Sequence, residues 1–175
     1  MVPPVIDPIV QRTGADCALA ALAMAAGLPY RTVSDVALDL TEKPHMKGLW
    51  VADMRRIMRQ LGYTLRNVKP DKLMEHGCGV MVVEFPKGER HCVTVYHDLI
   101  IDPVNGLIWE PDAYYQDSGA NATRGLIIGE PIRGRKSNLP KRCQSERIQT
   151  SVPSHPRIGP ATTRATVRSR NRKAR

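Results

Sequence analysis

The stretch from Gln11 to Gly27, QRTGADCALAALAMAAG, changes from a polar loop into an apolar run and constrains how the rest of the chain can fold. Residues 18–26 are Ala, Leu and Met without interruption, and all three are strong helix formers. We expect the side-chain oxygen of Asp16 to cap this helix and Gly27 to end it. Because the helix is apolar on every side and too short to cross a bilayer, the sequence predicts that it is buried in the core.

Cys17 directly follows the expected capping residue and lies in the first turn of this predicted helix. The positive end of the helix dipole favours a thiolate over a thiol at that position, which makes Cys17 a candidate nucleophile. A cysteine beside an apolar run is also commonly just a small core residue. The position alone leaves both interpretations open.

The rest of the chain changes from helical to strand-like periodicity. Two further helices are predicted, from about Thr32 to Leu40 with Thr32 as the cap, and from about Leu49 to Leu61. The later patterns predict strands over residues 63–68, 80–85, 90–97, 99–102 and 125–132, and short helical turns over 70–76 and 111–116. Because the helices come first and the strands follow without β-α-β alternation, the fold class is predicted to be α+β.

The strands over residues 90–97 and 99–102 are expected to form a hairpin with a tight turn near residues 97–98. His91 stands at the start of the first strand, and Asp102 stands at the end of the second. In an antiparallel pair these two ends are neighbours, so the imidazole and the carboxylate should come within reach of each other.

A nucleophilic site needs a thiol, an imidazole and a carboxylate that orients the imidazole. Cys17, His91 and Asp102 supply these groups, in this order along the chain. Gln11 would add an amide N–H donor for the oxyanion of a tetrahedral intermediate, and the backbone N–H of Cys17 would be the second donor. These four residues are the predicted catalytic site.

Several other residues have competing interpretations. His97 is a rival base on the same strand face, but we expect it to be solvated in the turn. Trp50 is expected to be a helix-face core or groove residue, and Cys78 and Cys92 are expected to be core residues with Cys92 facing away from His91. Because adjacent strand residues point in opposite directions, we expect no zinc site at His76, Cys78, His91 and Cys92, and the sequence indicates no metal or other cofactor.

The charge of the chain is distributed unevenly. Residues 133–175 contain 13 Lys and Arg and one acid, a balance of +12, whereas residues 1–132 carry −3 of the total of +9. The basic segment lacks large apolar residues, so a disordered basic tail over 133–175 is predicted to follow a globular domain over 1–132, with Cys143 as an exposed thiol. The tail would contact nucleic acid or an anionic surface without sequence preference, or act as a solubilising terminus.

The remaining features concern the compartment. Four scattered cysteines do not form a disulfide framework, and the N-terminus MVPPVIDPIVQ has neither a basic region nor a long apolar stretch. No segment is apolar enough for a transmembrane helix, so a cytoplasmic location is predicted. The oligomeric state leaves no signal in the sequence.

Three segments together resemble the bacteriocin-processing, double-glycine leader peptidases, a family of papain-like cysteine peptidases. Residues 11–22, QRTGADCALAAL, are similar to the family signature Q-x4-D-C-x-x-A-x-L. Residues 91–103, HCVTVYHDLIIDP, resemble its second block, in which a histidine opens an aliphatic strand and Asp-Pro ends the next. Residues 48–63, GLWVADMRRIMRQLGY, resemble the helix between the blocks.

The resemblance covers about residues 5–132 and implies a papain-like fold, with N-terminal helices packed on an antiparallel sheet. The family usually has Gly after the cysteine, and Ala18 in this chain implies a narrower approach to the thiol. By position, the resemblance implies four roles: Gln11 as oxyanion donor, Cys17 as nucleophile, His91 as general base and Asp102 as the residue that orients it.

The predicted function is therefore a thiol hydrolase that cleaves a peptide or related acyl bond of a peptide or protein substrate through an acyl-enzyme. Two alternatives stay open. In one, the same cleft binds an extended peptide without catalysis. In the other, the protein associates with nucleic acid through its basic tail, and the globular part is incidental.

Overall fold

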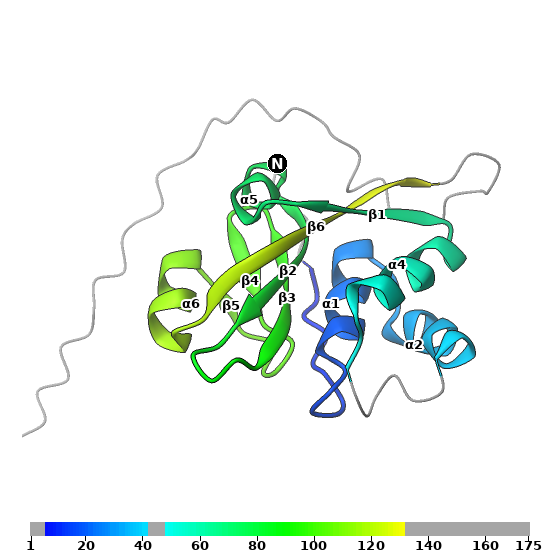
Figure 1. Cartoon of the computed structure of the whole chain (residues 1–175), viewed down its shortest axis with the longest axis horizontal. Helices are drawn as coiled ribbons and strands as arrows, with labels where there is room; N and C mark the ends of the chain where they lie inside the picture. Colours follow the sequence, from blue (N-terminus) through cyan, green and yellow to red (C-terminus); the bar gives the residue numbers. More distant parts are fainter. Residues whose placement is uncertain (1–5, 42–47, 132–175) are drawn as a thin grey trace, which may run out of the picture. The chain divides into compact units, whose positions relative to one another are not determined.

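The computed structural model of the chain describes residues 6–41 and 48–131 (Figure 1). The predicted tail over 133–175, its boundary and Cys143 lie outside the described residues. The helices are α1 (Cys17–Ala26), α2 (Tyr30–Leu40), α4 (Val51–Gln60), α5 (Pro70–His76) and α6 (Pro111–Ser118). The strands are β1 (Tyr63–Val68), β2 (Cys78–Glu84), β3 (Arg90–Tyr96), β4 (Leu99–Ile101), β5 (Ile108–Trp109) and β6 (Asn121–Pro131).

Within the described residues the strands form one antiparallel sheet in the order β1-β6-β2-β3-β4-β5. The predicted meander is present, because β2 pairs with β3 and β3 pairs with β4 through the turn at residues 97–98. The last strand, β6, lies between β1 and β2 and pairs with both. Helices on an antiparallel sheet confirm the predicted α+β class.

Helices cover both faces of the sheet (Figure 1). On one face α1 packs against β2 and β3, while α2 and α4 pack beside it, and α4 also contacts β1. On the other face α5 packs against β6 and β2, and α6 contacts β4. Each face has its own apolar core, since alternate residues of a strand point to opposite sides: Val80 belongs to the first core, and Met81 belongs to the second.

Helix α1 is buried as predicted, and residues 18–26 are each at most 3% exposed. It ends at Gly27, whose φ of 63° is left-handed, and the N–H of Leu28 donates to the carbonyl of Ala23 at 2.9 Å. The Thr94 hydroxyl donates to the carbonyl of Ala21 at 3.1 Å, so α1 is tied to the middle of β3. Among residues 6–41 and 48–131, none of the helices combines the length and apolarity that a membrane span requires.

Some predicted boundaries are wrong. Helix α2 begins at Tyr30 after Pro29, and Thr32 is exposed in its first turn and is not its cap. The helix begins two residues before the predicted polar cap, at Tyr30, whose side chain is buried. Strand β5 was not predicted, because two residues are too few for any periodicity, and β6 begins at Asn121, four residues earlier than its apolar run.

The close approach of α5 to the sheet predicts a steric effect at Gly125 of β6. A Cβ at this position would stand 2.8 Å from Leu73 Cβ and 2.9 Å from Val68 Cγ2. We therefore expect Gly125→Ala to lower the free energy of unfolding by about 1–3 kcal/mol, measured by urea denaturation. Gly14→Ala is the control, because a Cβ there would meet nothing within 4 Å. Equal unfolding free energies of the two variants would contradict the prediction.

Candidate active site

The loop before α1 is organised by the buried carboxylate of Asp16, which is 0% exposed. It accepts the backbone N–H of Arg12 at 3.0 Å and of Thr13 at 2.9 Å, and it also accepts the hydroxyl of Tyr30. Burial raises the pKa of Asp16, but these hydrogen bonds outweigh it and hold the pKa below its usual value. The guanidinium of Arg12 lies 4.4 Å over the ring of Tyr30 and closes the loop from outside.

The prediction that the side chain of Asp16 caps α1 is wrong. The carboxylate is directed back into the preceding loop and makes no cap hydrogen bond. The backbone carbonyl of Asp16 instead accepts the N–H groups of Leu19 and Ala20 at 3.0 and 3.1 Å. The carboxylate thus accepts the N–H groups of the loop instead of those of the first turn of α1. Asp16 thereby fixes the loop and α1 together, directly before Cys17.

Cys17 is the first residue of α1 and is half-buried. The Cys17 thiol interacts with the side chains of Cys92 and His91. The interaction with Cys92 lowers the pKa of Cys17 most, burial opposes it, and the interaction with His91 and the charge of His91 lower it further, so the pKa of Cys17 falls to about 4. The helix N-terminus favours the same anionic form.

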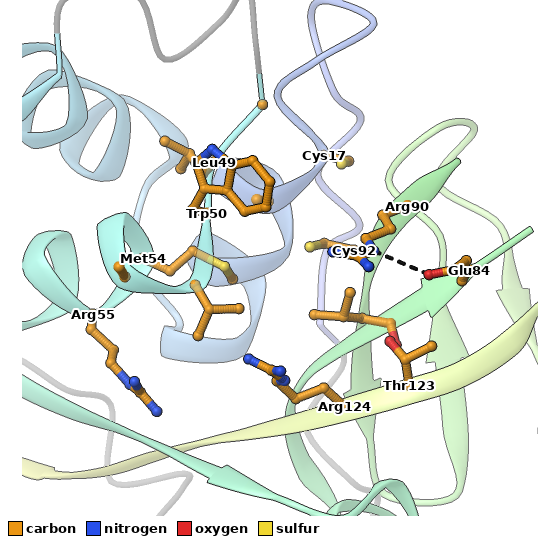
Figure 2. Close-up of a pocket in the computed structure, with 15 residues that line it drawn as sticks. Cys17, Leu49, Trp50, Met54, Arg55, Glu84, Arg90, Cys92, Thr123 and Arg124 are labelled. Carbon is orange, nitrogen blue, oxygen red and sulfur yellow. Dashed lines mark hydrogen bonds and ion pairs between the residues drawn. The ribbon is translucent and has the colours of Figure 1, made fainter. Parts of the chain in front are cut away.

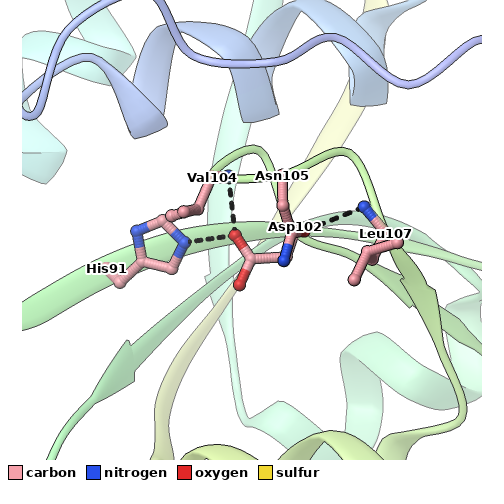
Figure 3. Close-up of polar contacts among 5 residues, drawn as sticks. All are labelled: His91, Asp102, Val104, Asn105 and Leu107. Carbon is pink, nitrogen blue, oxygen red and sulfur yellow. Dashed lines mark hydrogen bonds and ion pairs between the residues drawn. The ribbon is translucent and has the colours of Figure 1, made fainter.

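His91 and Asp102 form a buried pair at the end of the β3–β4 hairpin (Figure 3). The distance from His91 Nε2 to Asp102 Oδ1 is 2.8 Å. Both residues are buried, His91 with 7% of its surface exposed and Asp102 with 9%. Burial lowers the pKa of His91, but the hydrogen bonds to Asp102 and Cys17 raise it to about 9. The ring of Phe85 stacks at 6.0 Å from the His91 ring and covers the pair.

The turn after β4 holds the Asp102 carboxylate in place (Figure 3). The N–H of Val104 donates to Asp102 Oδ1 at 2.8 Å, and the N–H of Gly106 donates to the Asp102 carbonyl at 2.8 Å. Burial raises the pKa of Asp102, but the hydrogen bonds from His91 and from Val104 outweigh it and keep the pKa below its usual value. The carboxylate therefore stays ionised beside the imidazole.

Gln11 lies on the loop that leads to α1, and its backbone N–H donates to the carbonyl of Pro103 at 2.7 Å. This bond fastens the loop before Cys17 to the turn that follows Asp102. The Oε1 atom of Gln11 is buried without a hydrogen-bond partner among the described residues. The loops that carry Gln11 and Asp102 are thus joined on the same side of the sheet.

The structure places His91 beside Asp102 as the predicted hairpin implies, and the Cys17 thiol interacts with His91 and with Cys92. Cys92 is a core residue, as predicted, and is 7% exposed beside α1. Its interaction with Cys17 is not predicted by the sequence. Strand alternation already places Cys92 opposite Val93, on the face that α1 covers, but only the packing of α1 brings the two sulfurs together. His97 is exposed in the turn, as predicted.

A cavity of about 700 Å³ opens beside Cys17, and we call it the Cys17 cavity (Figure 2). One wall is the start of α4 with the residues before it, and the other wall is formed by β2, β3 and β6. Trp50 lies in the first wall and is 72% exposed, so it is a groove residue and not a core residue. Ala18 also lines the cavity, next to the thiol.

Among the residues that the structure describes, no group of three or more His, Cys, Asp or Glu is arranged to hold a metal ion. Cys78 lies at the far end of β2 from this site, and its thiol donates to the carbonyl of Ala25 at 3.6 Å.

The Asp16 network predicts a pH-dependent contribution to stability. Asp16→Asn weakens hydrogen bonds to an ionised acceptor, and we expect the free energy of unfolding to fall by about 2–4 kcal/mol at pH 6. Because the folded-state pKa is lowered, this contribution is present above the unfolded value of 3.8 and is lost as the pH falls through the folded pKa. Urea denaturation at pH 6 and below pH 3.8 measures it, and a difference that does not shrink in acid would contradict it.

The interactions of Cys17 with Cys92 and His91 predict how the reactivity of Cys17 depends on pH. Iodoacetamide alkylation, read for each cysteine by mass spectrometry, should reach its half-maximal rate for Cys17 near pH 4. Cys92→Ala removes the larger influence and should move this midpoint upward. Cys78, at the far end of β2, is the internal comparison, and its alkylation rate at a given pH should be the same in both chains. An unchanged midpoint in Cys92→Ala would contradict the role assigned to that thiol.

Comparisons with known proteins bear on the fold. No protein-family profile matches the chain, and no curated protein matches it in sequence. Its structure is similar to that of a double-glycine motif protease from an AMS/PCAT transporter, solved in complex with the leader peptide. The two chains are 20% identical with a TM-score of 0.50, and the match covers 74% of this chain and 91% of that one.

A second similar structure is the peptidase domain of Streptococcus ComA, described as a bifunctional ABC transporter involved in a quorum-sensing pathway. The identity is 18% and the TM-score 0.51, over 73% of this chain and all of that one (100%). The first is a double-glycine motif protease, the group that the sequence motifs resemble, and the second is a peptidase domain. The described residues therefore have the fold of the double-glycine peptidase domains.

Proposed function

We propose that the chain is a cysteine peptidase in which Cys17 attacks the carbonyl carbon of a peptide bond or related acyl bond. The observation that carries this proposal is the 2.8 Å hydrogen bond between His91 Nε2 and Asp102 Oδ1, in a pair whose imidazole also interacts with the Cys17 thiol and lowers its pKa. A buried thiol with no role in catalysis would have no need of an imidazole that is itself oriented by a carboxylate.

The pKa values of about 4 for Cys17 and about 9 for His91 define the resting form of the site. Between these two values the thiol is a thiolate and the imidazole is an imidazolium, so the nucleophile is formed before the substrate binds. Above the pKa of His91 the ring loses the proton that the leaving group needs. Activity would therefore be greatest between the two values.

In the first half of the reaction the thiolate forms a C–S bond, and the carbonyl electron pair moves onto oxygen. His91 Nε2 faces Asp102, so its other ring nitrogen, Nδ1, would give its proton to the leaving amine as the C–N bond breaks. In the second half, His91 takes a proton from water, the resulting hydroxide attacks the acyl-enzyme, and the C–S bond breaks. The thiolate–imidazolium pair is thereby restored.

The oxyanion of each tetrahedral intermediate would be stabilised by the backbone N–H of Cys17 and by the amide N–H of Gln11. The Oε1 atom of Gln11 has no hydrogen-bond partner among the described residues, so the amide is not held at its oxygen and can turn its N–H toward the oxyanion. Its tie to Pro103 would hold the donor on the side of the site that carries Asp102.

A peptide is the substrate class that we propose, since one of the similar structures was solved with a leader peptide and both are peptidase domains. By analogy, cleavage would follow a Gly-Gly pair, whose missing side chains suit an approach narrowed by Ala18 beside Cys17. Residues 1–132 would form the catalytic domain. The cytoplasmic location stays a prediction, and so does the contact of residues 133–175 with nucleic acid or an anionic surface.

Substitutions at the four site residues test the proposal with fluorogenic peptides that end in Gly-Gly before the reporter group. Cys17→Ala and His91→Ala should lower kcat/KM by about 10³-fold or more. Gln11→Ala should lower kcat by about 10²-fold with little change in KM, because the oxyanion exists only on the reaction path. Asp102→Asn should shift the acidic and basic limbs of the pH–rate profile as well as lower kcat.

His97→Ala is the matched control, since this histidine lies in the exposed turn of the same hairpin, and its kcat/KM should equal that of the native chain. An acyl-enzyme on Cys17, trapped with a slow ester substrate and seen by mass spectrometry, provides a second measurement. If no peptide or ester is turned over and Cys17 forms no adduct, the catalytic proposal fails and a peptide-binding module remains.

A further inference from the structure

The wall of the Cys17 cavity has an apolar part. Trp50, at the start of α4, has a 72% exposed indole, which is unusual for so large an apolar side chain. Leu49, Met54 and Val82 line the same space. A large exposed aromatic ring in the wall of a cavity is a typical contact for an apolar group of a ligand.

The charge of this cavity is not balanced. Its four charged lining residues are Glu84, Arg90, Arg55 and Arg124. Glu84 and Arg90 form an ion pair of 3.1 Å and neutralise each other. No carboxylate of residues 6–41 and 48–129 forms an ion pair with Arg55 or Arg124. The cavity therefore carries two positive charges that the described part of the chain leaves uncompensated.

These two arginines come from opposite walls, Arg55 from α4 and Arg124 from β6. Arg55 Nε donates to the carbonyl of Leu65 at 3.4 Å, which directs its guanidinium along β1 and leaves the terminal nitrogens unused by that bond. In Figure 2 both guanidinium groups lie on the side of the cavity away from Cys17, whereas Trp50 lies nearer the end that holds the thiol. A carboxylate at that end would be reached from two sides.

We propose that the Cys17 cavity selects peptides with an acidic side chain near the scissile bond, recognised by Arg124 and Arg55; the inference rests on the proposed peptidase function. An extended peptide bound across the site would set an apolar residue against Trp50. Its Asp or Glu residue would lie farther from the scissile bond, between the two guanidinium groups. Charge complementarity determines the choice, because a neutral or basic residue there would leave both cations without a partner.

Binding tests this proposal separately from catalysis. The full chain with Cys17→Ala is used to select binders from a random peptide library. We expect Asp or Glu to be enriched at one position, with an apolar residue at a fixed spacing from it. Arg124→Gln on the same background should weaken binding of a selected peptide about fivefold, the effect of a partly exposed ion pair. Replacing the acidic residue of the peptide by its amide should cost the same factor, and the two losses should not add.

Arg59→Gln is the matched control, because it removes the same charge from the exposed side of α4 outside the cavity. Since residues 133–175 are present in every variant, nonspecific attraction of acidic peptides to the basic segment cancels in the comparison. Arg124→Glu should reverse the preference toward Lys or Arg at the same position. A selection without acidic enrichment, or an enrichment that Arg124→Gln and Arg59→Gln reduce equally, would overturn the proposal.

The native chain is then offered the selected peptide and its amide variant. Faster cleavage of the acidic peptide, lost in Arg124→Gln, supports both the function and its specificity. Cleavage of both peptides at equal rates means that the peptidase proposal stands and the acidic preference fails. Binding with an acidic preference but without cleavage by the native chain means that the peptidase proposal fails while the recognition site remains.

Discussion

The position of Cys17 depends on the buried carboxylate of Asp16, which has hydrogen bonds but no ion pair among the described residues. Asp16 is fully enclosed, and its oxygens are occupied by two backbone N–H groups of the loop and by the hydroxyl of Tyr30. A charge can be buried in this way only if every donor keeps its position. The loop from Gln11 and the first turn of α1 are therefore one rigid unit, with Cys17 at their junction.

The second half of the site is held by a different part of the chain. Thr94 fastens β3 to the middle of α1, which brings the start of the strand to the start of the helix. The Asp102 turn then orients His91 from the far side. Since the thiolate, imidazolium and carboxylate alternate in sign, each charge stabilises its neighbour, and the site keeps three ionised groups in a largely buried position.

The sequence predicts those features that depend on local patterns. The apolar run of α1 and the hairpin that joins His91 to Asp102 follow from periodicity and turn chemistry. The insertion of β6 between β1 and β2 does not follow, because strand order depends on pairing between distant segments. Two details of the site could not be predicted from the sequence, because they too depend on contacts between distant segments. The direction of the Asp16 carboxylate depends on Tyr30, and the contact of Cys92 with Cys17 depends on how α1 packs.

Burial divides the region around the thiol into two parts with different constraints. His91, Cys92 and Asp102 are at most 9% exposed, so a substitution there disturbs packing as well as chemistry. Trp50 and Arg124 are exposed, so their side chains contribute less to the packing of the fold. A similar fold therefore constrains the packing of the buried residues, but it does not determine which side chains line the cavity wall. The substrate preference of this chain must be argued from its own arginines and tryptophan, not transferred from a protein of similar fold.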